Sequence, residues 1–253
     1  MSKSRSCWWD TTSAPETGLR RAFGLLLLLH ATLLAVWCCG QPLGASWREA
    51  DTMAIAVNLA REDFDLLQPR VDWRGDTDGS VECEWPLYQA MVGALAGDAG
   101  AAWPGRWLSL LASVLSATLW FHVLERRCGS RAAFLGGAAL VCGGQFAATA
   151  TRLIPDPTST LFGVAGLWVA LGFLRHQRSA WLIGATLLCT LAMLTKPTSA
   201  QWLALVGLWA LLGAPAVLRR VPVWVALLAA LGCLGLWLWH ARRLGLSTGL
   251  TFG

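Results

Sequence analysis

Apolar residues gather along the chain into about seven long stretches that short polar segments separate. Each stretch is close to the ~20 residues that a helix needs to cross ~30 Å of hydrocarbon. These stretches do not alternate between apolar and polar residues, as the strands of a transmembrane barrel would. The pattern therefore predicts an all-α fold, a polytopic bundle of transmembrane helices. The predicted spans are 22–39, 104–124, 132–149, 159–174, 180–194, 198–213 and 221–240.

The composition excludes a soluble globular protein. Of the 253 residues, 55% are apolar and only 14% are charged, and the mean hydropathy is +0.51. The chain contains sixteen tryptophans and a single tyrosine. Tryptophan is favoured at membrane interfaces, because its ring is largely apolar and carries one N–H donor. The composition thus supports a membrane environment and does not by itself indicate an activity.

Basic residues mark every second connection between the predicted spans. By the positive-inside rule, these connections and the N-terminus are predicted to be cytoplasmic, in a multi-pass protein of the cell inner membrane. The opposite face carries segment 40–103, which holds 11 of the 15 acidic residues and four basic ones. The net charge of +5 is therefore an average over two faces and gives no argument for nucleic-acid binding. The marking residues are Arg20, Arg21, Arg126, Arg127, Arg131, Arg175, Arg178, Arg219 and Arg220.

Two regions are predicted, a cytoplasmic tail over 1–21 and a transmembrane domain over 22–253. The first span follows basic residues but no A-x-A-like cleavage site follows it, so we interpret it as an uncleaved anchor. The outer loop over 40–103 is the predicted place for chemistry, because connections of this length are usually functional or disordered.

Two short helices are predicted in this outer loop. The first, over 50–61, has an amphipathic pattern and is expected to lie on the membrane. The second is predicted over 87–95. The segment 63–84 between them is polar and acidic, and we interpret it as a loop that covers a site. The apolar face of the first helix is predicted to consist of Met53, Val57 and Ala60.

Ionisable residues at the ends of the spans are further candidates for chemistry. Arg152 and Asp156 follow the third span. A charge at the bilayer centre costs about 2.5–3.5 kcal/mol on insertion scales, so both are placed at the membrane rim. Pro155 and Pro157 are expected to hold the Asp156 carboxylate on a stiff turn. The other cations at the outer rim are Lys196, Arg242 and Arg243.

The order of these features resembles a known family. The chain shows Arg48-Glu49-Ala50-Asp51 after the first span, Glu84-Trp85-Pro86-Leu87 and Arg106 at the second, and Arg152-Leu-Ile-Pro-Asp156 after the third. This order is similar to the N-terminal half of the GT-C membrane glycosyltransferases, in particular the group of the protein O-mannosyltransferases and the aminoarabinose transferase of lipid A. The resemblance runs from about Arg21 to the end. Family members are longer, so we expect the chain to be incomplete at its C-terminus.

The resemblance implies transfer of a sugar from a polyprenyl phosphate donor to an acceptor glycan, lipid or protein at the outer face, with inversion. Asp51 is implied as the general base, which takes the acceptor proton. Asp156 matches the second acidic motif, which orients the acceptor or helps to place a divalent metal; the motifs assign no metal ligands. Cations would stabilise the leaving phosphate. The residues implied in substrate binding are Arg152, Lys196, Arg242 and Arg243, together with Glu49 and Glu84.

One departure from the family limits the choice of substrate, and two other classes of protein are alternatives. Aminoarabinose transferases carry Glu-Lys-Pro-Pro where this chain has Glu84-Trp85-Pro86-Leu87, so the phosphate contact of that lysine is missing. The first alternative is a transporter or lipid-translocating protein, against which the nearly uncharged spans argue. The second is a noncatalytic remnant or partner subunit, which the short chain suggests.

Overall fold

The computed structural model describes residues 16–40, 46–97 and 100–251, so most of the predicted tail lies outside the described residues. The described chain is helical and forms no strand, only two isolated bridges. The predicted all-α fold is confirmed. The helices are α1 (Thr17–Gly40), α2 (Trp47–Arg61), α3 (Leu87–Ala96), α4 (Trp103–Cys128), α5 (Ser130–Val141), α6 (Gly144–Ala150), α7 (Asp156–His176), α8 (Ser179–Thr195), α9 (Gln201–Gly213) and α10 (Val221–Thr248), with the 3-10 helices η2 (Pro197–Ala200) and η3 (Pro215–Arg219).

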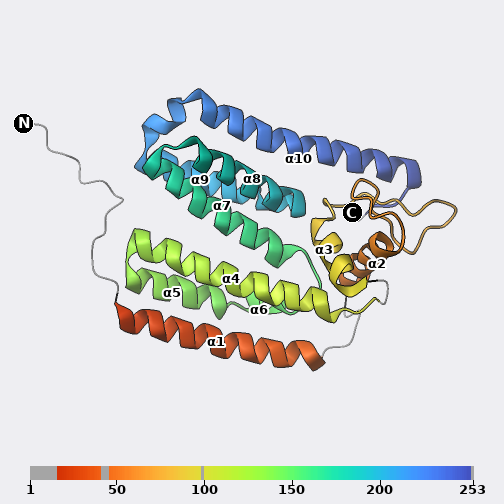
Figure 1. The fold of residues 1–253 in the computed structure, drawn as a ribbon, viewed down its shortest axis with the longest axis horizontal. Coiled ribbons are helices and arrows are strands. Elements are labelled where there is room, and N and C mark those ends of the chain that lie inside the picture. The colour runs from red at the N-terminus through yellow and green to blue at the C-terminus, as the bar shows by residue number, and fades with distance from the viewer. Residues whose placement is uncertain (1–15, 41–45, 98–99, 252–253) are drawn as a thin grey trace, which may run out of the picture.

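The long helices lie lengthwise beside one another, and α2 and α3 are grouped at one end of the bundle (Figure 1). Helix α7 is central, because it packs against α4, α8 and α9. Small residues allow this close packing. A Cβ atom added at Gly166 of α7 would lie 2.7 Å from Cys189 Sγ of α8. Apolar attraction is weak between helices in lipid, so such small residues are what bring the backbones together.

In the part of the chain that the structure describes, four helices are long and apolar enough to cross a membrane, namely α1, α4, α7 and α10. The bent pair α5 and α6 passes the same test as a fifth span. Helices α8 and α9 have 17 and 13 residues and are shorter than these four. Each of the seven predicted spans coincides with a helix or a pair of helices, but the structure supports four or five spans by length and composition.

The third predicted span is not a continuous helix. Helices α5 and α6 meet at an angle of 60° across Cys142 and Gly143. Gly143 adopts an extended conformation, with φ −67° and ψ 126°, and Gly144 follows it. Glycine is a poor helix former, because it loses the most backbone entropy on ordering. The span predicted over 132–149 therefore corresponds to a bent pair of helices and not to one continuous helix.

The two ends of the bundle differ in charge. We call one end of the bundle the arginine end, because the arginines that mark the basic connections gather there. It comprises the starts of α1, α5, α8 and α10 and the ends of α4, α7 and η3. Two ion pairs join its elements: Arg20 Nε lies 2.7 Å from Glu125 Oε1, and Arg131 Nε lies 3.3 Å from Glu16 Oε1. We name the opposite end the loop end, because it carries residues 46–97 (Figure 1). The basic connections, which alternate along the sequence, thus lie together at one end of the molecule.

The outer loop is a folded unit, and its first helix buries a different face from the predicted one. Helix α2 begins at Trp47 and packs against α3, where a Cβ atom at Gly93 would collide with the Ala56 carbonyl oxygen. Met53, Val57 and Ala60, the predicted apolar face, are only half-buried. Helix α2 packs against other parts of the outer loop. The orientation of the helix is therefore set by these protein contacts. The buried residues of α2 are Glu49, Thr52, Ile55, Ala56, Asn58 and Leu59. The second predicted helix is confirmed as α3.

Hydrogen bonds fasten the outer loop to the bundle. The Trp85 amide donates to the Leu194 carbonyl at the end of α8, at 3.0 Å. Trp237 Nε1 of α10 donates to the Cys83 carbonyl at 3.1 Å, and Thr248 Oγ1 donates to the Ser80 carbonyl at 2.7 Å. Both α8 and α10 therefore hold the outer loop against the helix bundle.

Candidate active site at the loop end

The first turn of α2 presents three candidate residues in different directions. Ser46 caps this helix, and its side chain accepts a hydrogen bond from the Glu49 amide at 3.3 Å. The Ser-x-x-Glu spacing is typical of a helix start. Successive residues of a helix are rotated by about 100°, so Glu49 and Asp51 point to nearly opposite sides, whereas Arg48 and Asp51 lie on the same side.

Glu49 lies inside the junction between α2, α4 and the turn that follows α6. Its side chain is 4% exposed, and Oε1 accepts a hydrogen bond from the Leu153 amide at 3.0 Å. The same oxygen lies 3.9 Å from a guanidinium nitrogen of Arg106, which is 5% exposed as a residue. Glu49 Oε2 has no hydrogen-bond partner among the described residues. The carboxylate predicted to bind substrate thus joins α2 to the turn that carries Arg152.

Replacing Glu49 is expected to loosen this junction. Glu49→Ala leaves the buried Leu153 amide without its acceptor, which costs about 1–3 kcal/mol, whereas Glu49→Gln keeps a carbonyl oxygen there. We expect the alanine variant to unfold at a lower temperature than the glutamine variant, measured by scanning calorimetry of the purified protein in detergent. Equal unfolding midpoints for the two variants would show that the Leu153 contact is not what Glu49 contributes.

Arg48 and Glu84 join the first turn of α2 to the segment before α3. An Arg48 guanidinium nitrogen lies 2.7 Å from Glu84 Oε1, and the Glu84 side chain is 15% exposed. Trp85, the next residue, is bonded to the end of α8. The predicted carboxylate Glu84 therefore lies between α2 and the helix end that Lys196 follows.

Asp51 faces the outer loop from the half-buried side of α2. Its Oδ1 accepts a hydrogen bond from Trp73 Nε1 at 3.1 Å. A carboxylate has about four lone-pair sites, and this contact uses one of them. Trp73 thus fixes the direction of the Asp51 side chain. The other lone pairs of the carboxylate remain able to accept a proton from another group.

Asp156 pairs with Lys196 where α7 begins and α8 has ended. Both side chains are about one quarter exposed, at 23% for Asp156 and 27% for Lys196. Asp156 Oδ2 is buried and has no hydrogen-bond partner among the described residues. The expectation of a stiff turn is wrong, because Asp156 is the first residue of α7. Pro157 is tolerated there, since the first amides of a helix have no intrahelical partner, and the helix dipole favours an acidic residue.

The other predicted cations have different surroundings. Arg152 is exposed and forms no ion pair with another described residue. An Arg242 guanidinium nitrogen lies 3.1 Å from Glu82 Oε2. The Arg243 guanidinium stacks over the Trp239 ring, with its central carbon 4.7 Å from the ring centroid. Of the cations implied for phosphate binding, Arg152 is therefore the one most open to a ligand.

The sequence analysis missed a buried polar network beneath the site. Tyr88 is completely buried, and its hydroxyl donates to the Gly105 carbonyl at 2.8 Å and lies 2.8 Å from Ser109 Oγ. Ser109 Oγ in turn donates to the Ile154 carbonyl at 3.3 Å. Burial raises the pKa of Tyr88 above its ordinary value, so the phenol stays protonated. The one signal for this network in the sequence was that Tyr88 is the single tyrosine of the chain.

Glu62 holds the outer loop together beyond the site. One of its oxygens lies 2.7 Å from an Arg74 guanidinium nitrogen, and the other contacts Arg70. These hydrogen bonds, first from Arg74 and then from Arg70, lower the pKa of Glu62 below its ordinary value of 4.5. The ionised form of Glu62 is thus the one that the folded loop stabilises.

The outer loop is expected to lose protection in acid. Because the pKa of Glu62 is lower in the folded loop than in an unfolded one, its contribution to stability is complete above pH 4.5 and is lost as the pH falls through the folded-state pKa. Hydrogen exchange of segment 62–82 measured from pH 7 down to pH 3, after correction for the intrinsic exchange rate, should show this loss. In Glu62→Gln the protection should be lower at pH 7 and should depend less on pH than in the wild type. A pH dependence unchanged by that variant would contradict the assignment.

Most of the predicted residues lie in two parts of the loop end. The first part is α2, with Asp51 open to the loop and Glu49 bonded to the turn before α7. The second is the Asp156–Lys196 pair at the ends of α7 and α8. The Trp85–Leu194 hydrogen bond joins the second part to Glu84 and hence to α2. Arg242 and Arg243 lie on α10 and contact Glu82 and Trp239 instead. In the described ranges, no three His, Cys, Asp or Glu side chains gather to hold a metal ion.

Comparison with known proteins identifies the class. The family model described as dolichyl-phosphate-mannose-protein mannosyltransferase matches residues 85–239. Together with the apolar helical bundle, this match defines a multi-pass membrane glycosyltransferase of the GT-C type that uses a lipid-linked sugar. The matched part exceeds half of the chain, and the chain belongs to the dolichyl-phosphate-mannose-protein mannosyltransferase family. No curated protein and no solved structure matches it.

This family assignment confirms the resemblance that the motifs suggested. The matched residues include Arg152, Asp156 and Lys196, whereas Asp51 precedes them. The match thus covers the second part of the site and leaves out helix α2, which carries Asp51.

Proposed function

We propose that the chain transfers a hexosyl or pentosyl group from a polyprenyl phosphate to an acceptor at the loop end, with inversion and with Asp51 as the general base. The observation that carries this proposal is the junction at the first turn of α2. Through Glu49 and Leu153, it holds the helix that bears Asp51 against the turn that bears Arg152. A base and a cation are thereby fixed on one rigid support.

The reaction is a direct displacement. The acceptor oxygen or nitrogen attacks the anomeric carbon from the face opposite the phosphate, and its bond to that carbon forms as the bond from carbon to phosphate oxygen breaks. Asp51 takes the proton that the acceptor loses. Polyprenyl phosphate departs with the bonding electron pair. A phosphate is already a good leaving group, so an acid partner such as glycosidases use is not needed.

Cations stabilise the charge that grows on the departing phosphate. Arg152 is exposed and can form charge-assisted hydrogen bonds with phosphate oxygens. Lys196 is the second cation, and Asp156 keeps its ammonium group at the end of α8. We assign Asp156 to positioning Lys196. Glu84 has the corresponding role toward Arg48.

We place the loop end at the periplasmic face of the inner membrane and the N-terminus in the cytoplasm. The support is the gathering of arginines at the opposite end, because basic residues are enriched in cytoplasmic connections. The acceptor is then a glycan, lipid or protein outside the cytoplasm.

The proposal is tested with purified protein in liposomes. Radiolabelled polyprenyl phosphate donors that carry mannose, glucose or a pentose are offered with a membrane extract as acceptor, and the anomeric configuration of the product is determined by NMR. Transfer from one donor with the opposite anomeric configuration in the product is expected. Retention of configuration would refute direct displacement, and a protein that binds no donor and transfers no sugar would refute the proposed activity.

A further inference from the structure

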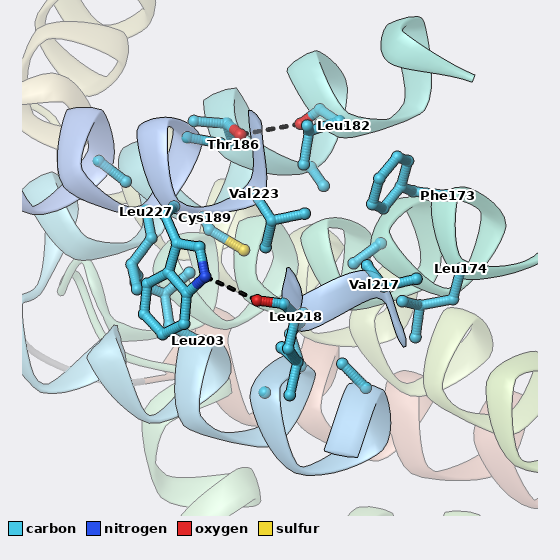
Figure 2. Close-up of a pocket in the computed structure, with 18 residues that line it drawn as sticks. Phe173, Leu174, Leu182, Thr186, Cys189, Leu203, Val217, Leu218, Val223 and Leu227 are labelled. Carbon is cyan, nitrogen blue, oxygen red and sulfur yellow. Dashed lines mark hydrogen bonds between the residues drawn. The ribbon is translucent and has the colours of Figure 1, made fainter. Parts of the chain in front are cut away.

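An apolar cavity lies among α7, α8, α9, η3 and α10 (Figure 2). Its lining residues place it in the half of the bundle next to the arginine end. Its volume is about 190 Å³. Helix α9 packs on α7 and α10 packs on α8, and the cavity lies between these two pairs. The lining includes Phe173, Leu182, Leu203, Val217 and Leu227.

The cavity wall offers hydrocarbon rather than hydrogen-bonding groups. The hydroxyl of Thr186, one of its few polar side chains, donates to the Leu182 carbonyl at 2.8 Å within α8 (Figure 2). Trp224 Nε1 donates to the Leu218 carbonyl at 2.7 Å, so the indole N–H is also satisfied. Water would find no partners along such a wall, and an alkyl chain would lose none.

Arginines stand at the arginine end of this cavity. Arg178 is the N-cap residue of α8 and precedes the lining residue Leu182 by one turn. Arg220 is the N-cap residue of α10 and precedes the lining residue Trp224 by one turn. Arg219 lies beside it at the end of η3. All three arginines are exposed, and none forms an ion pair with another described residue.

Two of these arginines, Arg178 and Arg220, occupy electrostatically unfavourable positions at helix N-termini. A helix N-terminus carries about half a positive charge, which favours acidic residues there and disfavours basic ones. The first turns of α8 and α10 contain no acidic residue. The sequence contains no Asp or Glu anywhere over 157–253. Two positive helix ends and three guanidinium groups therefore lie at the arginine end of the cavity with no acidic residue in their own elements, and an anion placed there would be stabilised.

We propose that this site binds an anionic diacyl phospholipid from the leaflet at the arginine end. One acyl chain enters the apolar cavity, and the phosphate is held by Arg178, Arg219 and Arg220. Only a molecule with both an alkyl chain and an anionic group uses both features of the site. Basic pockets between membrane helices bind acidic lipid head groups by the same physics. The proposal concerns the end of the bundle opposite the sugar-transfer site and does not depend on it.

The head-group half is tested by native mass spectrometry of the full chain in detergent. The protein is titrated with phosphatidylglycerol and with phosphatidylcholine of identical acyl chains. We expect one phosphatidylglycerol to be retained in preference to phosphatidylcholine. The double variant Arg178→Gln/Arg220→Gln should bind phosphatidylglycerol about 25-fold more weakly, at roughly fivefold per arginine. The matched control Arg126→Gln removes an exposed arginine at the same end but away from the cavity, and should change nothing.

The acyl-chain half is tested by filling the cavity. Gly207 lines it, and a Cβ atom at that position would meet no atom within 4 Å, so Gly207→Phe can fold and occupy the space. This variant should lose retained phosphatidylglycerol. Gly232→Phe is the control, because Gly232 is exposed on α10, equally free of neighbours and outside the cavity lining. Both variants should elute from size-exclusion chromatography like the wild type.

Three results would overturn the proposal. The first is equal retention of phosphatidylglycerol and phosphatidylcholine by the wild type, which would leave the arginines without a role. The second is unchanged phosphatidylglycerol affinity in Gly207→Phe at matched elution, which would place the lipid elsewhere. The third is displacement of phosphatidylglycerol by an equal concentration of glycerol phosphate, which would make the site one for a free phosphate.

Discussion

Asp51→Asn is expected to lower the rate of sugar transfer by about 10²–10⁴-fold, the range that a general base contributes. Asparagine has nearly the same shape as aspartate, and its carbonyl oxygen can accept the hydrogen bond from Trp73 Nε1 that Asp51 accepts at 3.1 Å. It cannot take a proton from the acceptor. Transfer should therefore fall while the fold and the donor affinity are kept. The measurement is the single-turnover rate with radiolabelled donor, beside a separate equilibrium measurement of donor binding.

The matched control for this prediction is Asp76→Asn. Asp76 is an exposed carboxylate in the same acidic loop, so its replacement removes one negative charge without touching α2. We expect its transfer rate to equal that of the wild type. If Asp51→Asn also transfers sugar at the wild-type rate, Asp51 is not the base. If Asp76→Asn loses activity to the same extent, the effect comes from the charge of the loop.

Lys196→Met is expected to have the second largest effect. Methionine keeps the length of the side chain but removes the cation proposed to stabilise the departing phosphate, and the loss of one such group costs about 10²–10³-fold in rate. The change also leaves the Asp156 carboxylate, 23% exposed, without the ammonium group that it contacts. The unfolding temperature should therefore fall as well, because a partly buried charge is left uncompensated.

A double variant separates the two effects of Lys196. Asp156→Asn/Lys196→Met removes both charges, so it should recover most of the unfolding temperature lost in Lys196→Met. It should not recover sugar transfer, because the cation is still absent. Lys196→Arg should restore part of the transfer rate, since it keeps a positive charge at the end of α8. Recovery of transfer in the uncharged double variant would show that Lys196 has only a structural role.

Local pattern was enough to place most of the helices. Helix α3 lies within one residue of its predicted bounds, and α7 and α8 enclose their predicted spans with a few residues added. Apolar stretches of this length determine helices in lipid, because every backbone amide and carbonyl must find a partner within its own segment. The break between α5 and α6 was missed, since a pair of glycines weakens a helix without deciding that it bends.

Only part of the candidate site could be predicted from the sequence. Asp51 and Asp156 were predicted from the order of motifs along the chain, and Lys196 from its place at the end of a predicted span. The contact of Trp73 with Asp51 was not found, because no short-range spacing encodes it. The same is true of the Glu49 contact with Leu153, which joins residues 104 positions apart. Arg106 carried one usable signal, an ionisable residue in the first turn of a membrane helix.

The sequence by itself determined a helical membrane bundle with a basic end and an acidic outer loop, since hydropathy and charge act through the surrounding lipid and water whatever the helix neighbours are. Only the tertiary structure decided which face of α2 is buried, and that Glu49 points into a junction while Asp51 points out of it. It also decided that an apolar cavity lies beside Arg178 and Arg220. These features depend on contacts between distant segments, and the free energy of such contacts is set by packing that no local window of the sequence contains.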